Sequence, residues 1–268
     1  MVTVALLGGG KMGAALLGGL LDAGFDAESL TVAEVDAGRR HDLERRFAGV
    51  RVAPSPAWAV ADATVVIVAV KPADVAEVLE AASPALGDGA LVLSIAAGVT
   101  IGTIEAAAPG RPVVRAMPNT PAVVRAGVSA IAAGSLATDA HLALAEQILG
   151  AVGTVVRVDE AALDAVTGLS GSGPAYVFLV AEALVEAGVL VGLTRDVAEQ
   201  LVVQTLVGSA ALLADGTDGP SALRAAVTSP GGTTAAALRV LETAGVRAAF
   251  LDAVTAATQR SAELGRST

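Results

Sequence analysis

The strongest constraint on the fold is the alternation of short apolar runs with helical patterns along residues 1–158. Thr64–Val70 reads TVVIVAV, and its β-branched residues favour a strand that is buried on both faces. The other predicted strands are Val2–Leu7, Leu30–Val35, Ala90–Ser94, Pro112–Arg115, Ser129–Ala132 and Thr154–Val158. The predicted helices between them are Lys11–Ala23, Arg39–Phe47, Ala73–Ala82 and Asp139–Leu149. Such alternation predicts a mostly parallel sheet that is covered by helices on both faces.

The pattern changes near Asp159. From there to Thr268 no convincing strand pattern occurs, and the segments favour helices instead. The predicted helices are Ala161–Thr167, Pro174–Ala187, Arg195–Leu213, Ala222–Val227, Thr233–Glu242 and Val246–Leu264, with Gly188, Gly216 and Gly245 as expected helix ends. The sequence therefore predicts an α/β domain over residues 1–158 and an all-α domain over residues 159–268.

Composition narrows the functional classes. The mean hydropathy of +0.67 raises the question of a membrane span. We expect none, because serines and glycines interrupt the uncharged stretches Gly89–Ile104 and Ala165–Ala181. The start MVTVALLGGG favours a strand and turn over a signal peptide. A net charge of -10 argues against a nucleic-acid partner, and the absence of cysteine excludes disulfides, thiolate catalysis and Cys-ligated metal. We expect no metal site and a cytoplasmic protein.

The predicted helical half is unusually apolar. Between Pro174 and Leu193 the only charged residues are Glu182 and Glu186, which lie four apart on one helix face. Two carboxylates at this spacing suit either an acid/base pair or the solvated face of an otherwise buried helix. A helix that is apolar nearly all round needs burial on several sides. We therefore expect a two-fold homodimer whose helical domains interlock.

The first chemical motif is a glycine-rich turn after the first predicted strand. Gly8, Gly10 and Gly13 fit the pattern G-x-G-x-x-G, and Lys11 and Met12 complete the turn that opens the next helix. The glycines permit a tight turn, close approach of a pyrophosphate and close packing of helix on strand. The N–H groups and the dipole at the helix N-terminus favour a phosphate. The turn therefore predicts that the chain binds a dinucleotide.

Glu34 lies 21 residues after Gly13, at the end of the second predicted strand. An acidic residue there can accept hydrogen bonds from a ribose 2′-hydroxyl, which favours NADH, and it would repel the 2′-phosphate of NADPH. Arg39 and Arg40 follow closely and suit either such a phosphate or a solvated first helical turn. The sequence leaves the choice between NADPH and NADH open.

Further candidate site residues follow the later strands. The Val-Lys-Pro sequence at Lys71 ends a strand at the edge where ligands bind in open α/β folds. Lys71 suits either a catalytic amine or a loop whose main chain lines the cofactor, and we favour the loop. The small residues Ser94–Gly98 permit close approach of the nicotinamide half. Asn119 stands in a proline-rich loop and suits either a hydrogen bond to a ribose or carboxamide or a turn.

Two motifs of the helical half suit substrate binding. Thr167–Tyr176 is expected to form a compact loop that leads into a helix. Ser229–Thr234 reads SPGGTT and predicts a turn that presents consecutive backbone N–H groups and two hydroxyls before a helix. Such a nest suits an anion and predicts a substrate with a carboxylate.

Three longer stretches resemble signature stretches of the pyrroline-5-carboxylate reductases: Arg115–Ala122 (RAMPNTPA), Asp164–Phe178 (DAVTGLSGSGPAYVF) and Val227–Ala237 (VTSPGGTTAAA). Ala69–Pro72 (AVKP) and the Gly8–Gly13 turn fall where that family has them, so the resemblance spans the whole chain. It implies an oxidoreductase that makes L-proline from 1-pyrroline-5-carboxylate, the last step of proline biosynthesis. It also implies a Rossmann domain for NADPH or NADH and a helical domain that forms dimers, which can associate into decamers.

The resemblance also implies which residues form the site. The implied cofactor residues are Gly8–Gly13, Ala69, Val70, Lys71, Pro72 and Ser94–Ala97, which include Ala96 and Ala97. The implied substrate residues are Gly231, Gly232, Thr233 and Thr234, with the hydroxyl of Thr234 as the catalytic group near the ring nitrogen. Hydride transfer goes from the dihydronicotinamide to the imine carbon, and positioning of the reactants is the main work of the protein. No general acid is evident, so the proton comes with the substrate or from water.

One departure and two rivals bear on this hypothesis. Many relatives carry Ser or Thr where Glu34 stands, which bears on the cofactor and not on the reaction. A β-hydroxyacid dehydrogenase would need a lysine or another base, and the helical half contains no lysine. A non-catalytic dinucleotide-binding regulator would keep Gly8–Gly13 but would not need the Gly231–Thr234 nest.

Overall fold

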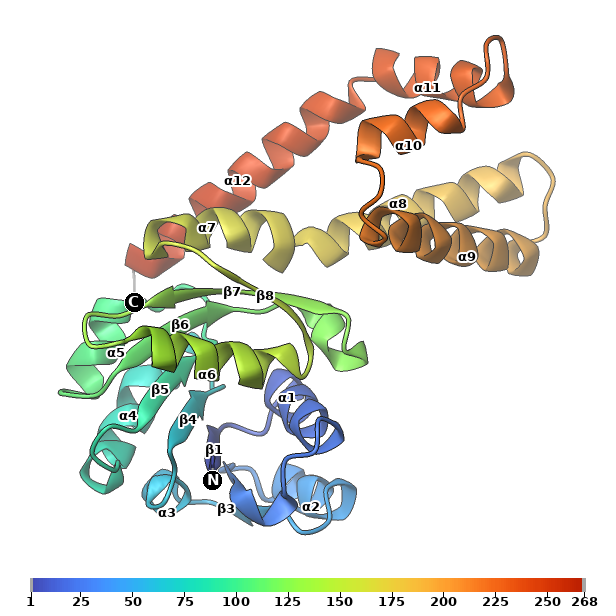
Figure 1. The fold of residues 1–268 in the computed structure, drawn as a ribbon. Coiled ribbons are helices and arrows are strands. Elements are labelled where there is room, and N and C mark those ends of the chain that lie inside the picture. Colours follow the sequence, from blue (N-terminus) through green and yellow to red (C-terminus); the bar gives the residue numbers. More distant parts are fainter. Residues whose placement is uncertain (1, 267–268) are drawn as a thin grey trace. The chain divides into compact units, whose positions relative to one another are not determined.

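The structure is a computed structural model that describes residues 2–266 (Figure 1). The chain forms two compact units. The first holds the residues up to Ser172 together with those from Thr255 onward, and the second is Gly173–Val254. The predicted division into a cofactor domain over 1–158 and a helical domain over 159–268 stays a prediction.

The first unit is built on one sheet of eight strands in the order β3-β2-β1-β4-β5-β6-β7-β8. Neighbouring strands are parallel except for β6 and β7, which are antiparallel. The strands are β1 (Val4–Leu7), β2 (Leu30–Ala33), β3 (Arg51–Ala53), β4 (Val65–Val68), β5 (Leu91–Ser94), β6 (Val113–Met117), β7 (Gly127–Ala133) and β8 (Gly153–Arg157). The predicted mostly parallel sheet is confirmed, and seven of its strands follow the predicted runs.

Helices and short turns connect the strands. The α-helices of this part are α1 (Lys11–Asp22), α2 (Ala37–Arg46), α3 (Pro56–Val60), α4 (Val75–Ala82), α5 (Ile101–Ala107), α6 (Asp139–Gly150) and α7 (Leu163–Val166). The 3₁₀ turns are η1 (Ala27–Ser29), η2 (Pro72–Asp74), η3 (Ser83–Ala85), η4 (Thr120–Val124) and η5 (Glu160–Ala162), and η6 (Thr167–Gly171) is a π-helical turn. The strand β3 and the helices α3 and α5 were not predicted, because elements this short show barely one period of any pattern.

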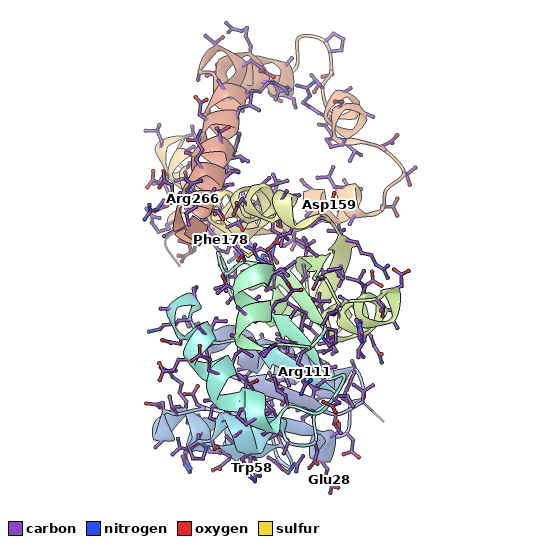
Figure 2. All side chains as sticks on the ribbon, turned by 90° about the vertical axis from the view of Figure 1, so that its left-hand side faces the viewer. Glu28, Trp58, Arg111, Asp159, Phe178 and Arg266 are labelled. Carbon is purple, nitrogen blue, oxygen red and sulfur yellow. The ribbon has the colours of Figure 1, made fainter. Side chains whose placement is uncertain are left out.

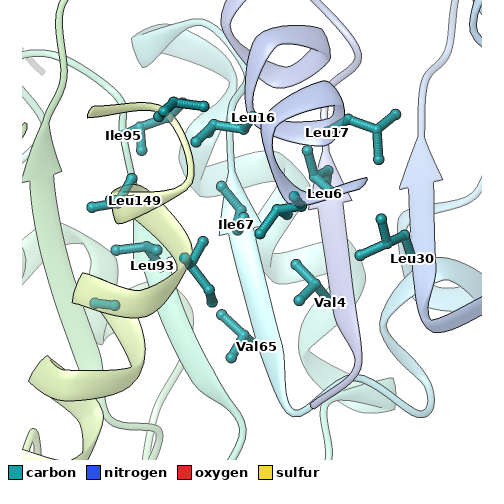
Figure 3. Packing of buried hydrophobic residues seen from close by; sticks show 14 of the residues in the cluster. Val4, Leu6, Leu16, Leu17, Leu30, Val65, Ile67, Leu93, Ile95 and Leu149 are labelled. Atoms are coloured by element: carbon teal, nitrogen blue, oxygen red, sulfur yellow. The ribbon is translucent and has the colours of Figure 1, made fainter. Parts of the chain in front are cut away.

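Alternate residues of each central strand pack on opposite faces of the sheet. On one face, Leu6 and Ile67 pack with Leu16 and Leu17 of α1 and with Leu149 of α6 (Figure 3). On the other face lies a second buried cluster that includes α3, α4 and α5. Each of the strands β1, β4 and β5 is buried along its whole length. Burial on both faces explains why these strands are continuous apolar runs in the sequence.

The strand order changes direction at β1. The chain proceeds from β1 to β2 and β3 on one side, and β4, β5 and β6 follow on the other side. In open parallel sheets such a switch point leaves a crevice at the carboxyl ends of the strands, where ligands bind. The strand order therefore predicts such a crevice between the ends of β1 and β4.

The second unit is helical, as predicted. It contains α8 (Gly173–Leu190), α9 (Arg195–Ala214), α10 (Pro220–Ala226), α11 (Thr233–Thr243) and the first part of α12 (Val246–Arg266). Gly216 and Gly245 have positive φ and follow helix ends, as expected. The exposed side chains of this unit include many large apolar ones, among them Phe178 (Figure 2).

Two local predictions in the helical half are wrong. Gly188 does not end its helix, because α8 continues to Leu190 and Gly192 has the positive φ that follows it. A Cβ on Gly188 would lie 3.0 Å from the Cβ of Ala198, so the glycine permits close packing of α8 on α9. The expected compact loop that begins at Thr167 is also absent, because residues 167–171 form the helical turn η6. The helix predicted from Pro174 is present and begins at Gly173 as α8.

Candidate active site

The turn between β1 and α1 contains the three glycines of the predicted pattern. Gly8 has a φ of +106°, and a Cβ there would lie 2.8 Å from the carbonyl oxygen of Ala69 at the end of β4. A Cβ on Gly13 would overlap the carbonyl oxygen of Gly8. The backbone therefore requires glycine at both positions. A Cβ on Gly10 would meet no protein atom within 4 Å, so the space beside it is open to a ligand.

The N-terminus of α1 faces this turn. Gly10 is its N-cap, and the first N–H that donates within the helix is that of Ala14, at 2.8 Å from the carbonyl oxygen of Gly10. The N–H groups of Lys11, Met12 and Gly13 consequently have no acceptor within the helix. No acidic side chain stands in the first turn to oppose an anion. The open side of Gly10 and these donors fit the pyrophosphate of a dinucleotide.

Glu34 follows β2 and is only 4% exposed. Its carboxylate accepts the N–H of Gly9 at 3.0 Å and the N–H of Asp36 at 2.9 Å. The guanidinium of Arg39 lies 3.6 Å from the same carboxylate, and Arg40 donates to two backbone carbonyl oxygens at 2.8 and 2.9 Å. The carboxylate is thus held against the glycine turn, and both arginines that could bind a 2′-phosphate already have partners.

A cavity of ≈ 280 Å³ opens at the carboxyl ends of β4, β5 and β6. Its lining is mostly small or apolar, which suits the nicotinamide half of a cofactor. It brings together eight of the predicted cofactor residues: Met12, Ala69, Val70, Pro72, Ile95, Ala96, Ala97 and Asn119. It also includes four that were not predicted as cofactor residues: Met117, Pro118, Thr120 and Gly171. Met117 is the last residue of β6, and Pro118 and Thr120 come shortly after it, so their position at the end of a strand was a usable signal.

Asn119 lines this cavity, but its amide group already bonds to two distant segments. The side-chain N–H donates to the carbonyl oxygen of Ser170 in η6 at 3.2 Å, and the side-chain oxygen accepts the N–H of Val128 in β7 at 2.9 Å. The expected contact of Asn119 with a ribose or carboxamide stays a prediction.

A second cavity of ≈ 560 Å³ shares Pro72 and Ala97 with the first. The π-helical turn contributes Thr167 to it, and Arg260 and Ser261 of α12 contribute as well. All these residues belong to the first unit. The turn η6 therefore borders both cavities, through Gly171 on one side and Thr167 on the other.

Both lysines lie outside the first cavity. The side chain of Lys71 is exposed, and its backbone forms the N-cap of η2. Its neighbours Val70 and Pro72 line the first cavity, and the role of Lys71 stays a prediction. Lys11 lines a separate hollow beside Arg46 and Arg125. Within residues 2–266, no group of three or more His, Asp or Glu side chains is arranged to hold a metal ion.

The predicted substrate motif forms a turn at the start of α11, in the second unit. Gly231 has a φ of +71°, and Gly232 is the N-cap. The N–H of Gly232 donates to the carbonyl oxygen of Ser229 at 3.1 Å, which closes the turn. Thr233 and Thr234 are the first two residues of the helix, so their N–H groups have no acceptor within it. The local geometry suits an anion, and the role of the motif stays a prediction.

The chain is similar in sequence to known proteins along nearly its whole length. Residues 160–264 match the family model of pyrroline-5-carboxylate reductase dimerisation, and residues 3–98 match that of NADP oxidoreductases, coenzyme F420-dependent. A pyrroline-5-carboxylate reductase of Mycobacterium tuberculosis is 48% identical over 98% of this chain and 97% of its own length.

Two solved structures are similar over nearly the whole chain. A pyrroline-5-carboxylate reductase from Coxiella burnetii has a TM-score of 0.93 and 38% identity, and 98% of each chain is covered. The pyrroline carboxylate reductase of Plasmodium falciparum, solved with NADP bound, has a TM-score of 0.86 and 29% identity, again over 98% of each chain. The chain belongs to the pyrroline-5-carboxylate reductase family.

Proposed function

We propose that the chain reduces 1-pyrroline-5-carboxylate to L-proline, the final step of proline biosynthesis. The observation that carries the proposal is the small-residue cavity beside the glycine turn, in a member of this reductase family. When bound, NADPH or NADH supplies the hydride that adds to the imine carbon. The imine nitrogen gains a proton, so the C=N bond becomes a C–N bond and the cofactor leaves in its oxidised form.

Residues of the first unit hold the cofactor in this proposal. The backbone N–H groups of Lys11, Met12 and Gly13 bind the pyrophosphate, because they point out of the helix without acceptors. Glu34 stands where an adenosine ribose approaches the end of β2. The main chain from Ala69 to Pro72 and the small side chains of Ala96 and Ala97 enclose the nicotinamide half. The NADP-bound structure of the Plasmodium enzyme supports this use of the fold.

The turn Gly231–Thr234 holds the substrate. Its N–H groups at the start of α11 bind the carboxylate, and the hydroxyl of Thr234 contacts the ring nitrogen. The carboxylate and the ring nitrogen together fix the orientation of the ring, and positioning of reactants can lower a barrier by roughly 7–11 kcal/mol. The resemblance of SPGGTT to the family's motif supports this assignment.

The test is the loss of absorbance of the reduced nicotinamide on addition of 1-pyrroline-5-carboxylate. We expect Thr234→Ala to lower kcat/KM by about 10- to 150-fold, since a hydrogen bond to a charged group contributes about 1.5–3 kcal/mol. Thr243→Ala is the matched control, because it removes a hydroxyl that bonds only within α11, to the carbonyl oxygen of Arg239. Full activity of Thr234→Ala would remove that residue from the mechanism. A folded wild-type chain that binds the cofactor without turnover would refute the reaction itself.

A second copy of the chain covers the apolar helices in our proposal. By length and composition, Glu160–Leu190 and Arg195–Ala214 could each cross a membrane, and only 6% of each hydrophobic window is buried within the structure. The match to the dimerisation model includes both stretches. Glu182 and Glu186 lie in the middle of α8, where lipid would penalise their charges. A homodimer of these helices is therefore preferred to a membrane span.

Sedimentation of two variants tests the homodimer. Leu201 in α9 is 55% exposed, and Leu136 in the first unit is 52% exposed. We expect Leu201→Glu to halve the mass of the particle and Leu136→Glu to leave it unchanged. Recovery of the wild-type chain in the membrane fraction would contradict this proposal. We also propose that dimers assemble into a decamer in the cytoplasm, and a particle mass of two chains would limit the assembly to the dimer.

A further inference from the structure

Asn119 is unusual among the residues of the cofactor cavity, because it is tied to segments far from it in sequence. Its amide bonds to Ser170, 51 positions away, and to Val128, nine positions away. One side chain thus joins the loop after β6, the strand β7 and the π-helical turn η6. Each bond uses one of the two hydrogens or one of the two acceptor positions of the amide.

The segment that accepts the hydrogen bond of Asn119 departs from regular α-helical hydrogen bonding. The N–H of Ser172 donates to the carbonyl oxygen of Thr167 at 2.8 Å, which is the wide hydrogen-bonded ring of a π-helix. The hydroxyls of Thr167 and Ser170 donate to carbonyl oxygens four residues earlier, at 2.8 and 3.1 Å, and such bonds tend to bend a helix. Single π turns are frequent at functional sites. The hydrogen bond from Asn119 to Ser170 is a contact from outside the helix that can hold this turn in one position.

The turn η6 forms part of the wall of the first cavity. Gly171 lines this cavity together with Ala69 and Ala96, and a Cβ on Gly171 would lie only 2.6 Å from the side chain of Met117. On its other side η6 borders the larger cavity through Thr167. A shift of the turn would therefore move a wall of both cavities.

We propose that Asn119 is a positioning residue, which acts through its hydrogen bond to Ser170 and holds η6 against the nicotinamide half of the cofactor. The proposal rests on the use of this cavity by NADPH or NADH. Asn119 influences the orientation of the nicotinamide ring in the cavity and how deeply the ring enters it. It contributes little to the affinity for the cofactor. Hydride transfer is sensitive to such placement, since a shift of about 1 Å can reduce the rate on the order of 10²-fold.

Two substitutions separate the two hydrogen bonds. Asn119→Ala removes both. Asn119→Asp has the same shape and keeps the acceptor for the N–H of Val128, but it places an oxygen against the carbonyl oxygen of Ser170. The matched control is Thr64→Ala, at a residue that lies just before β4 at the amino end of that strand. The side chain of Thr64 also makes two hydrogen bonds to a residue far away in sequence: it accepts the N–H of Thr3 at 3.0 Å and donates to the carbonyl oxygen of Thr3 at 2.9 Å.

The test measures three quantities for each folded variant. These are the dissociation constant of the reduced cofactor, the rate of hydride transfer in a single turnover at saturating substrate, and the fluorescence of bound NADH. We expect both Asn119 variants to slow hydride transfer on the order of 10²-fold and to lower the fluorescence of bound NADH, with the dissociation constant changed by less than about threefold. Thr64→Ala is expected to leave all three quantities near those of the wild type.

Three results would overturn the proposal. The first is a normal hydride-transfer rate or normal NADH fluorescence in Asn119→Asp. The second is a loss that appears mainly as weaker cofactor binding, which would make Asn119 a direct contact. The third is an equal loss in Thr64→Ala, which would indicate a general effect of stability. The fluorescence of bound NADH needs no substrate, so it tests the proposal even if another imine or acid proves to be the substrate of this chain.

Discussion

Glu160 is the best place to test how the first unit is held together. Its carboxylate oxygen Oε1 accepts a hydrogen bond from Arg115 of β6 at 3.0 Å and one from the N–H of Ile101 at 2.6 Å. Ile101 is the first residue of α5, so one oxygen joins the sheet, a helix N-terminus and the turn η5. The side chain of Arg115 is 8% exposed and that of Glu160 is 36% exposed.

We expect Glu160→Ala to lower the free energy of unfolding by about 3 kcal/mol, because it leaves a buried guanidinium without its carboxylate. Loss of one partner of a buried pair costs about 3–5 kcal/mol, and the partial exposure of Glu160 places the effect at the lower end. Replacing both partners is different, since an apolar pair of similar volume can be nearly neutral. The double variant Arg115→Met with Glu160→Ala should therefore be more stable than Glu160→Ala alone.

Urea denaturation of the full chain at one protomer concentration measures these differences. With a slope near 3 kcal/mol/M, the midpoint of Glu160→Ala should fall by about 1 M. Asp42→Ala is the control, because it breaks an exposed pair with Arg45 whose side chains are 69% and 74% exposed. That control should change the stability by less than about 1 kcal/mol. The reasoning fails if Glu160→Ala matches the control, or if the double variant is the least stable of the set.

Three further predictions concern the cofactor and the pH dependence. Glu34→Ser removes a fixed carboxylate from the end of β2. We expect this change to raise the ratio of kcat/KM with NADPH to kcat/KM with NADH about tenfold, which corresponds to about 1.4 kcal/mol. An unchanged ratio in parallel assays with the two cofactors would contradict this prediction. Gly13→Ala would push a methyl group into the carbonyl oxygen of Gly8. Calorimetry should therefore find that the variant binds the cofactor at least about tenfold more weakly than the wild type. Normal binding would show that the turn adapts to the methyl group. The hydrogen bond from Arg157 lowers the pKa of the Glu146 carboxyl below its ordinary 4.5. The contribution of this pair to the free energy of unfolding is therefore present above pH 4.5, and it is lost as the pH falls through the lower pKa of the folded state. Titration of Glu146 by NMR should find this shift in the wild type and its absence in Arg157→Gln.

The sequence predicted the central strands well because their burial is two-sided. A run such as TVVIVAV is apolar at every position only where helices cover both faces, and β4 has that environment. The short elements were missed because they lack a long run of residues that is buried on both sides. The edge strand β3 is exposed or half-buried along its length, and α3 and α5 are only five and seven residues long.

Some residues of the candidate site could also be predicted from the sequence, and others could not. The glycine turn was readable because its requirements are local: a positive φ at Gly8 and free N–H groups at the start of α1. Asn119 was selected as a cofactor residue from its loop, and nothing in that loop points to its bond with Ser170. The helical nature of residues 167–171 was missed because glycines and serines in a row resemble a loop.

The sequence by itself determined the features that depend on neighbouring residues: the strand–turn–helix at Gly8–Gly13, the change from mixed to helical structure after residue 158, and the motifs that resemble the reductase family. The tertiary structure alone decided which distant residues meet. It placed Gly171 beside the ends of β4 and β5, and it placed the carboxylate of Glu34 against Gly9. Such meetings follow from the order of the strands in the sheet and from the packing of helices on it, and these long-range contacts have no local signature along the chain.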